Sequence, residues 1–490
     1  MNRLLNDLKS VTIDYGDYGV RAAKEGEVTV KQTDEGNGIV LLNAEYPVFF
    51  IELTWSYQTP KDARTLGDTW ERTYGDMEWL PLDPDRMNPW YVLAVKDGRT
   101  TGFGMCVGPN AIGAWKISPD TVTLILDVRN GGDGAQVQGR TIELCEFVSE
   151  TYEGMSPYRA CQSFCALMSP HPLLPDKPLY GGNNWYYAYG KSSREQILSD
   201  AKLQKELSEG LENRPFMVID DGWEINHACG PWESNEKFGD MKSLADEIKA
   251  MGVRPGIWTR VLYTTDPMPE CAHIHGKFLD PSDPKVLSYV RDLIDKICGW
   301  GFELIKHDYT AIDFFNGALD HMDRFPASDG WHFHDRTKTT AEIIKELYKT
   351  IYETAKGRAM ILGCATVSFL GVGMMHAART GDDTSGVDFK YTYRNGYNAL
   401  GFKLMQNRTF FAADADCCGI LPNTIPWETN GQWAEMLARS GSPFFISCAY
   451  DTLTPEQRKQ MKELYAIASV QKEDPEPEDW FENKRPVRYV

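Results

Sequence analysis

A lysine and an aspartate stand at the end of a short apolar run in the second half of the chain. Residues 302–310 read Phe-Glu-Leu-Ile-Lys-His-Asp-Tyr-Thr, so the apolar pair at 304–305 leads into Lys306 and Asp308. A carboxylate beside an ammonium group stays ionised and can act as a nucleophile or a base. Asp308 is therefore the first candidate for chemistry. The alternative is a buried lysine–aspartate pair that only orders a loop.

Similar polar and aromatic side chains follow other apolar runs of the chain. Asp and Asn side chains hydrogen-bond to hydroxyl groups, and Trp offers a flat apolar face on which the C–H face of a sugar can stack. If these positions converge in space, they form a lining suited to a carbohydrate. The candidates are Asn183, Asn184 and Trp185; Asp220, Asp221 and Trp223; Arg260; Cys364 and Thr366; Arg379, Asp382 and Asp383; and Asp414 and Asp416.

Strand-like and helix-like segments alternate over residues 176–472. Helix starts are predicted at the capping residues Ser192, Thr339 and Thr454. Eight alternating units are typical of a (β/α)8 TIM barrel, in which the C-terminal ends of the strands carry the chemistry. The strands are predicted at 179–187, 216–220, 254–258, 302–307, 359–364, 376–380, 409–413 and 443–448.

Residues 1–175 have a different pattern. Short alternating apolar segments are separated by turn signals such as Asp97-Gly98 and Asp133-Gly134, which favours an antiparallel β-sandwich. A proline-rich stretch at the end of this region separates it from the barrel. Residues 473–490 are predicted to be a tail or the start of a small β element. The N-terminal domain could supply a loop to the barrel mouth, form an oligomer interface, or act only as a platform.

Composition argues against several classes of partner. The chain has 490 residues and a formal net charge of −19, which argues against nucleic acid and anionic membranes and favours neutral or cationic small molecules. No run approaches 18 apolar residues, so we expect no transmembrane helix. The N-terminus lacks the apolar core of a signal peptide, and the 11 cysteines include no CxxC pair, so we expect a cytoplasmic protein with reduced thiols. We expect no cofactor and no metal site, and homo-oligomerisation is left open.

Three of these segments together resemble the signatures of glycoside hydrolase family 36. Residues 219–223, 304–309 and 379–385 read Ile-Asp-Asp-Gly-Trp, Leu-Ile-Lys-His-Asp-Tyr and Arg-Thr-Gly-Asp-Asp-Thr-Ser, in the order found in that family. The family contains α-galactosidases, α-N-acetylgalactosaminidases and raffinose-synthase-type transferases. Its architecture joins an N-terminal β-sandwich to a (β/α)8 barrel. The resemblance covers the layout of the whole chain and the motifs from residue 179 to about 450.

The resemblance implies a role for each matched residue. Asp308 takes the place of the family's nucleophile, and Lys306 takes that of a lysine that binds sugar hydroxyls. Asp382 matches the acid/base, and Asp220 and Asp221 match an acidic pair that binds O4 and O6 of galactose. The remaining expected substrate contacts are Trp185, Trp223, Arg260, Cys364, Arg379 and Asp383.

The chain also departs from the family's pattern. His307 stands where the nucleophile segment usually has Trp. Gly381 and Ser385 stand where a Ser and a second Asp are usual, which makes Asp383 a rival to Asp382 as the acid/base. These departures put the substrate in doubt more than the class of reaction.

The resemblance implies a retaining exo-α-glycosidase that hydrolyses terminal α-galactosides through a covalent intermediate on Asp308. Small residues after Cys364 would leave room for a 2-acetamido group, so an α-N-acetylgalactosaminidase is an alternative. A galactosyl transferase of the raffinose-synthase type is another. More distant alternatives are an aldolase-type barrel that uses Lys306 as a Schiff base and a sugar-binding module without hydrolysis.

Overall fold

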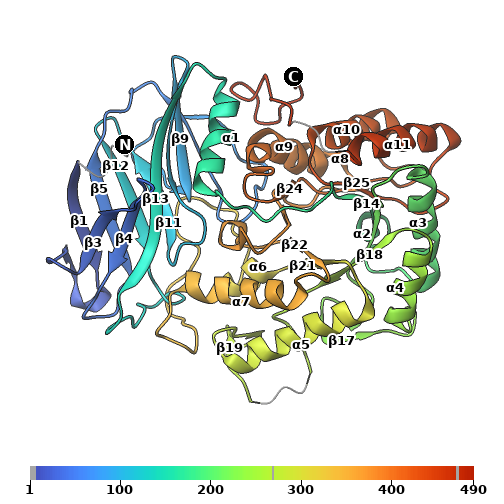
Figure 1. Ribbon diagram of the computed structural model, residues 1–490, viewed down its shortest axis with the longest axis horizontal. Helices are drawn as coiled ribbons and strands as arrows, with labels where there is room; N and C mark the ends of the chain where they lie inside the picture. Colours follow the sequence, from blue (N-terminus) through green and yellow to red (C-terminus); the bar gives the residue numbers. More distant parts are fainter. Residues whose placement is uncertain (1–6, 267–269, 471–473) are drawn as a thin grey trace.

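Antiparallel sheets build the first third of the chain, and one parallel sheet builds most of the rest. The computed structural model describes residues 7–266, 270–470 and 474–490. In Figure 1 the antiparallel strands lie at one end of the molecule, and the parallel strands with their helices fill the other end. We call residues 7–168 the antiparallel part.

Two antiparallel sheets of six and seven strands make up this part. The first has the order β2 (Val20–Ala22), β1 (Leu8–Asp14), β5 (Phe50–Ser56), β12 (Thr121–Asp127), β11 (Ile112–Ile117) and β8 (Asn88–Pro89). The second has the order β3 (Val28–Gln32), β4 (Gly38–Leu42), β13 (Ile142–Glu153), β10 (Arg99–Met105), β9 (Tyr91–Lys96), β6 (Arg64–Gly67) and β7 (Leu80–Pro81).

Large aromatic side chains fill the space between the two sheets. Buried and less buried residues alternate along β5, as expected for a strand with one face in a core. The ring centroids of Trp55 on β5 and Phe147 on β13 lie 5.2 Å apart, so the two sheets are in direct contact. Helix α1 (Pro157–Met168) packs on the second sheet, where a Cβ at Gly102 would come within 2.6 Å of the ring of Phe164. This close approach therefore requires glycine.

The parallel sheet has nine strands and curls on itself. Each of the eight predicted strands overlaps a strand of this sheet, and β25 is an addition that the sequence did not predict. Two predictions are wrong in their bounds, because residues 185–187 belong to a short helix and residues 409–411 lie before β24. The edge strands are separated in the chain only by residues 415–417, so the curled sheet brings its two edges close together. The order is β24 (Ala412–Asp414), β23 (Ala377–Arg379), β22 (Met360–Gly363), β21 (Leu304–His307), β18 (Arg254–Thr259), β15 (Phe216–Ile219), β14 (Tyr180–Asn183), β26 (Phe444–Ser447) and β25 (Cys418–Gly419), with every neighbouring pair parallel.

Helices follow most of these strands and pack on the sheet. The predicted starts at Thr339 and Thr454 are confirmed, each with a complete capping box. The start predicted at Ser192 is wrong by one residue, because Ser193 has the extended backbone of an N-cap and accepts a hydrogen bond from the N–H of Gln196. The longer helices are α3 (Arg194–Leu207), α4 (Met241–Ala250), α5 (Pro284–Trp300), α7 (Thr340–Ala355), α10 (Trp427–Ser440) and α11 (Pro455–Ala468).

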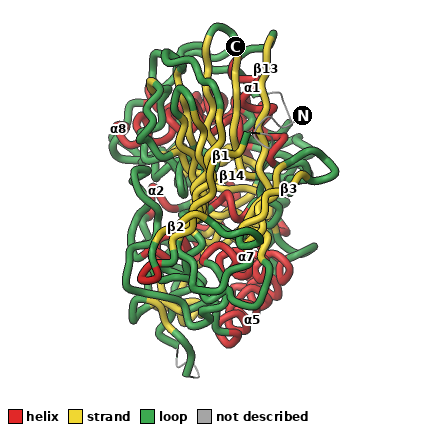
Figure 2. The backbone as a smooth tube through the Cα atoms, turned by 90° about the vertical axis from the view of Figure 1, so that its left-hand side faces the viewer, coloured by secondary structure: helices red, strands yellow, loops and turns green. Residues whose placement is uncertain are grey.

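Shorter elements complete the parallel region. Within the described ranges, no helix has the length and apolarity needed to cross a membrane. Figure 2, viewed from the antiparallel end, shows α5 and α7 together at the bottom of the molecule. The short helices are α2 (Trp185–Ala188), α6 (Thr310–Phe315), α8 (Phe389–Tyr391) and α9 (Tyr397–Lys403), and two small hairpins pair β16 (Glu224–Asn226) with β17 (Cys229–Ser234) and β19 (His273–Ile274) with β20 (Phe278–Leu279).

The C-terminal tail packs back onto the antiparallel part. Nε of Arg159 on α1 donates a hydrogen bond of 2.7 Å to Oε1 of Glu476. The ring of Trp480 meets that of Trp79 edge-on with centroids 5.2 Å apart, so an aromatic contact joins the tail to the loop after β6. The tail thus connects the two regions of the chain.

Candidate active site

A pocket opens where the parallel strands end. Its volume is about 400 Å³ with the open mouth included. The lining comes from the ends of four neighbouring strands, β14, β15, β18 and β21, from the end of β23, which is separated from β21 by β22, and from the loops that follow the strands. This is expected at the C-terminal edge of a curled parallel sheet. The lining residues are Asn183, Trp185, Tyr186, Asp220, Asp221, Trp258, Lys306, Asp308, Tyr309, Arg379, Asp383 and Asp416.

Asp308 lies in this pocket as an ionised carboxylate. Its Oδ2 accepts a hydrogen bond of 3.1 Å from Nε1 of Trp258, and its Oδ1 accepts one of 2.7 Å from the N–H of Tyr309. Burial alone would raise the pKa of Asp308, but the charges of Lys306 and Arg72 and these two hydrogen bonds lower it below its usual value. The carboxylate is therefore held in one orientation and keeps its negative charge.

Lys306 is bound to the end of β15. Its Nζ lies 2.8 Å from Oδ2 of Asp220, which also accepts a 2.6 Å hydrogen bond from Nδ2 of Asn183. The N–H of Asp220 donates to Oδ1 of Asn184 at 2.6 Å. Burial would lower the pKa of Lys306, but the negative charges of Asp220 and Asp308 keep it well above its usual value. The ammonium group therefore stays charged and offers hydrogen-bond donors to a ligand in the pocket.

Asp221 belongs to a second hydrogen-bonded group at the pocket. Nδ1 of His227 lies 2.8 Å from Oδ2 of Asp221, and the N–H of Ala228 donates to Oδ1 of Asp221 and to Oε1 of Glu224. Burial, together with the hydrogen bond and charge of Asp221, raises the pKa of Glu224 to about 9, so Glu224 keeps its proton at neutral pH. Ligand atoms of Asp221, Glu224 and His227 lie within 4.8 Å of one another, close enough for a metal ion. The carboxylate oxygens already have partners in His227 and in the N–H groups of Gly222 and Ala228.

Arg379 is a buried cation at the end of β23. Its Nη2 lies 3.0 Å from Oδ2 of Asp416 and 3.2 Å from Oδ1 of Asp383. Asp416 also accepts hydrogen bonds from the hydroxyl of Tyr186 and from the N–H and hydroxyl of Thr384. This network fixes the segment that carries the two adjacent candidate acids.

The adjacent Asp382 and Asp383 have different surroundings. Asp383 lines the pocket beside Arg379, with 51% of its side chain exposed. Desolvation and the charges of Asp416 and Asp382 raise the pKa of Asp383 against the opposing effect of Arg379 and Arg72. Asp382 is outside the lining, and its Oδ1 lies 2.8 Å from Nη2 of Arg72. A raised pKa and a place in the pocket lining suit a proton donor, and Asp383 has both, although each of the two aspartates pairs with an arginine.

Two predicted sugar contacts, Trp223 and Arg260, lie behind the lining. The indole of Trp223 is fully buried and donates from Nε1 to the carbonyl oxygen of Trp258 at 2.9 Å. Arg260 forms two hydrogen bonds with Asp313, and its guanidinium lies 4.2 Å from the ring centroid of Tyr309. Both side chains therefore support lining residues from behind. The sequence alone shows that a residue follows a strand, but it does not show whether the side chain points into the pocket or into the core.

Cys364 is also outside the lining. Cys364 is 2% exposed, and its Sγ lies 3.7 Å from Nη1 of Arg379. Ala365, Thr366 and Val367 after it are buried as well. The small residues that follow Cys364 thus lie in the interior and not along the pocket wall.

A loop of the antiparallel part contacts the segment that carries Asp382 and Asp383, and the sequence did not predict this role for its residues. We call residues 68–77 the clamp loop. The N–H of Thr73 donates to the carbonyl oxygen of Thr380 at 2.9 Å, and the N–H of Asp382 donates to that of Thr73 at 2.8 Å. A loop supplied by the N-terminal region was one of the three roles that the sequence left open for that region. No motif in the sequence of this loop pointed to Arg72.

Comparison with known proteins relates the fold to glycoside hydrolases. No protein-family model and no curated protein matches the chain. Among solved structures, an α-galactosidase from Thermus thermophilus in complex with stachyose superposes with a TM-score of 0.61 at 15% identity, over 90% of this chain and 99% of that one. The GH36 α-galactosidase AgaA from Geobacillus stearothermophilus superposes with a TM-score of 0.61 at 15% identity, over 94% of this chain and 73% of that one.

The similarity covers the antiparallel part as well as the parallel sheet, because nine tenths of the chain is matched in each case. At 15% identity it concerns the course of the backbone and not individual side chains. The chain therefore has the fold of the GH36 α-galactosidases, as the three sequence segments predicted.

Proposed function

We propose that this protein is a retaining exo-α-glycosidase that hydrolyses terminal α-galactosides through a covalent glycosyl intermediate on Asp308. One observation carries the proposal: the pocket holds two carboxyl groups with opposite pKa shifts, Asp308 lowered and Asp383 raised. A retaining glycosidase needs such a pair, because one group attacks as an anion and the other gives a proton. The fold shared with α-galactosidases supports the same reaction.

The reaction proceeds in two displacements at C1 of the sugar. An Oδ of Asp308 attacks C1 while the bond from C1 to the leaving oxygen breaks, and Asp383 gives its proton to that oxygen. The products of this step are a glycosyl ester on Asp308, an ionised Asp383 and the released alcohol. Asp383 then takes a proton from water, whose oxygen attacks C1 and displaces Asp308. The sugar leaves with its anomeric configuration retained, and both carboxyl groups are restored.

We assign the acid/base role to Asp383, although the family resemblance favours Asp382. Asp383 is in the pocket lining and Asp382 is not. Both aspartates pair with an arginine, Asp382 with Arg72 at 2.8 Å and Asp383 with Arg379 at 3.2 Å, so the difference lies in their access to the pocket. A group that must hold and exchange a proton needs access to the substrate and a raised pKa, and Asp383 has both.

We assign binding of the sugar hydroxyls to the charged groups at the ends of β14, β15 and β21. Asp220 and Asp221 offer acceptor oxygens, Lys306 offers donors, and Trp185 offers an aromatic face at the pocket wall. A polar set that pairs with specific hydroxyls discriminates strongly between sugars, because a wrong sugar leaves buried groups unpaired. The Thermus thermophilus enzyme was solved with p-nitrophenyl α-D-galactopyranoside, which supports a galactoside as the first substrate to test.

The alternative activities have less support. A Schiff base needs a neutral lysine, but the pKa of Lys306 is raised well above its usual value by Asp220 and Asp308, which outweigh burial. An α-N-acetylgalactosaminidase would need room near Cys364, and the residues after it are buried outside the pocket wall. Hydrolysis and galactosyl transfer share the first step, so product analysis with an added sugar acceptor separates them.

The domain organisation belongs to the same proposal. We assign residues 176–472 to a (β/α)8 catalytic barrel, residues 1–175 to a β-sandwich domain, and residues 473–490 to a C-terminal tail. Limited proteolysis tests this division. Cleavage between 169 and 179 that leaves two associated fragments would agree with it, and early cleavage within either unit would contradict it.

The first test is nitrophenol release from p-nitrophenyl α-galactoside and p-nitrophenyl α-N-acetylgalactosaminide, with wild type beside Asp308→Ala. We expect turnover of the galactoside that falls by at least about a thousandfold in the variant, because the covalent step is lost. Azide should restore release and give a galactosyl azide of inverted configuration. Unchanged turnover in Asp308→Ala would rule out the nucleophile, and a preference for the acetamido sugar would rule out the proposed substrate.

A further inference from the structure

We propose that Arg72, which comes from the antiparallel part, is a positioning residue of the active site at the end of the parallel sheet. The inference rests on the proposed glycosidase reaction. The guanidinium holds Asp382 out of the pocket and acts through its charge on Asp308 and Asp383. Asp383 is thereby left as the group that exchanges protons with the substrate.

The clamp loop is fixed to the segment that carries both aspartates. Thr73 exchanges two backbone hydrogen bonds with that segment, one to the carbonyl oxygen of Thr380 and one from the N–H of Asp382. The hydroxyl of Thr73 also lies 2.6 Å from Oδ1 of Asn398 on α9. The backbone next to Arg72 is thus hydrogen-bonded to the segment that carries its partner Asp382. Because this backbone is already fixed, little conformational entropy is lost when the ion pair forms.

Arg72 is buried between the two regions of the chain. Its side chain is 10% exposed, Nη2 lies 2.8 Å from Oδ1 of Asp382, and the guanidinium carbon lies 5.5 Å from the ring centroid of Tyr74. Nε lies 3.3 Å from Oε1 of Glu71, which is fully buried. Burial raises the pKa of Glu71 against the effect of Arg72 and Tyr74, which favours the neutral acid. The positive charge of Arg72 is therefore available to the carboxylates across the interface.

Arg72 is one of several charges that face the two reacting carboxyl groups. It lowers the pKa of Asp308 and opposes the rise in the pKa of Asp383. Asp308 is also faced by Glu71 of the clamp loop and by Lys306, His307, Tyr309, Arg260, Asp313 and Cys364. Asp383 is faced by Arg379, Asp416, Tyr186, Tyr309 and Asp382.

Removal of the charge of Arg72 should move the pH profile of the reaction in one direction, whereas loss of packing alone should not move it. Without Arg72, the pKa of Asp308 rises, so the nucleophile ionises only at higher pH and the acidic limb of kcat/KM moves up. The pKa of Asp383 also rises, so the proton donor keeps its proton to higher pH and the basic limb moves up as well. The whole bell-shaped profile therefore shifts toward higher pH. A substitution that only loosens the fold lowers the height of the profile and leaves its limbs in place.

The test is the pH profile of kcat/KM for p-nitrophenyl α-galactoside in Arg72→Gln, Arg72→Lys and Arg99→Gln. Arg99 lies on β10 of the same part, is largely exposed and pairs with Glu153 only at 3.6 Å, so Arg99→Gln removes an equal charge far from the pocket. In Arg72→Gln we expect both limbs to move up by about 0.5 to 1 pH unit, the effect of losing one nearby opposite charge. Arg72→Lys should restore most of this shift, and Arg99→Gln should match wild type.

Limbs of Arg72→Gln that coincide with those of wild type would overturn the inference. If wild type hydrolyses no aryl α-glycoside, the proposed function itself is wrong. The pairing of Arg72 with Asp382 can then still be tested by a measurement that does not depend on activity. In thermal unfolding, Arg72→Gln and Asp382→Asn should be non-additive, with the double variant melting no lower than Arg72→Gln alone. Strictly additive shifts in Tm would show that Arg72 and Asp382 do not act on each other, and the positioning role would fail.

Discussion

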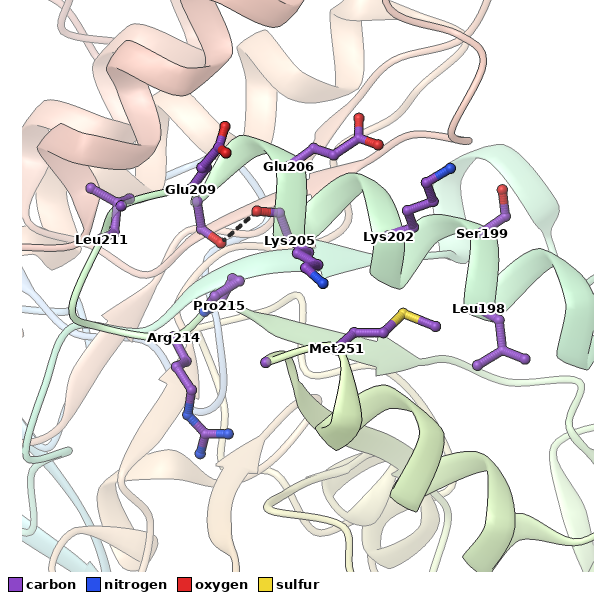
Figure 3. A pocket seen from close by; sticks show the side chains of 13 residues that line it. Leu198, Ser199, Lys202, Lys205, Glu206, Glu209, Leu211, Arg214, Pro215 and Met251 are labelled. Carbon is purple, nitrogen blue, oxygen red and sulfur yellow. Dashed lines mark hydrogen bonds between the residues drawn. The ribbon is translucent and has the colours of Figure 1, made fainter.

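The two ends of the parallel sheet both carry charged side chains, but those at one end are on the whole more deeply buried. At the end where the strands begin, a pocket of about 1490 Å³ lies beside α3 and the end of α4, against about 400 Å³ for the candidate active site, open mouths included. Figure 3 shows Lys202, Lys205, Glu206, Glu209 and Arg214 around this larger pocket. The larger hollow is thus on the side of the sheet away from the strand ends that carry Asp308.

The charges of the larger pocket remain in contact with water. Glu209 is 80% exposed and pairs with Lys462 at 3.3 Å, and Glu206 is 37% exposed and pairs with Arg458 at 3.0 Å. In the candidate active site, the side chains of Arg379 and Asp416 are 2% and 4% exposed. Water screens the first set, whereas the second set shifts the pKa values of its neighbours. The two pockets therefore differ in the burial of most of their charges as well as in volume.

The largest expected effect is a loss of activity on substitution of one of the two adjacent aspartates of the candidate active site. Asp383→Asn should lower kcat/KM for an unactivated α-galactosyl disaccharide by about a hundredfold or more, the usual worth of a general acid. Asp382→Asn should lower it by less than about tenfold, because it removes an ion-pair partner and not a proton donor. Steady-state kinetics on the disaccharide and on an aryl galactoside measure both.

The aryl substrate serves as the control for this pair. Its nitrophenolate leaves with little help from an acid, so Asp383→Asn should slow the first step much less with the aryl substrate than with the disaccharide. The reverse order, with Asp382→Asn the more damaging on the disaccharide, would return the acid/base role to Asp382.

A smaller effect concerns stability and comes from His307, the last residue of β21. His307 is fully buried, neither ring nitrogen has a hydrogen-bond partner among the described residues, and burial lowers its pKa to about 4. Since the folded pKa lies below the unfolded value, the unfolded chain takes up the proton first as pH falls, and stability is lost between about pH 6.5 and 4. His307 should account for about 2 to 3 kcal/mol of this loss at pH 4.5.

Urea unfolding of wild type and His307→Phe at pH 7 and pH 4.5 measures this contribution. His376, whose pKa burial also lowers to about 4, remains in both proteins and provides the matched background. The drop in unfolding free energy between the two pH values should be smaller in His307→Phe by about 2 to 3 kcal/mol. An equal drop in both proteins would mean that His307 is charged or solvated in the folded state.

The smallest effect is expected at the larger pocket. Glu209→Gln removes one partner of an exposed ion pair, so the free energy of unfolding should change by less than about 0.5 kcal/mol. The value of kcat/KM should match wild type, because the residue lies at the opposite end of the sheet from the candidate active site. A loss of activity beyond about twofold would break the comparison between the two ends, since exposed charges of this kind are largely screened.

Much of the architecture could be predicted because strands of a parallel sheet have a simple signature. Most of the eight predicted strands are short apolar runs bounded by turn signals, and nearly every residue of the corresponding strands is buried in the structure. The ninth strand, β25, was missed because two residues, Cys418 and Gly419, are too short a segment for any periodicity. The helix caps at Thr339 and Thr454 were predicted correctly because capping depends on residues only three apart.

The candidate site was predictable only in part. Asp220, Lys306 and Asp308 follow apolar runs and line the pocket, because a strand end in sequence is a position at the mouth of the sheet. Trp223 also follows such a run but turns into the core, and Arg260 takes Asp313 as its partner. The direction of a side chain beyond a strand end depends on the loop that follows, and the sequence has no period there.

By itself the sequence determined the kinds of groups available and the strand ends on which they stand. It fixed a lysine two residues before an aspartate, an acidic pair after an earlier strand and two adjacent aspartates after a later one. Only the tertiary structure decided which of the adjacent aspartates lines the pocket and which one pairs with Arg72, some 310 residues earlier in the chain. Charge interactions act through space at a few ångströms, whatever the separation along the chain, and residues so far apart meet only when both regions have folded and packed.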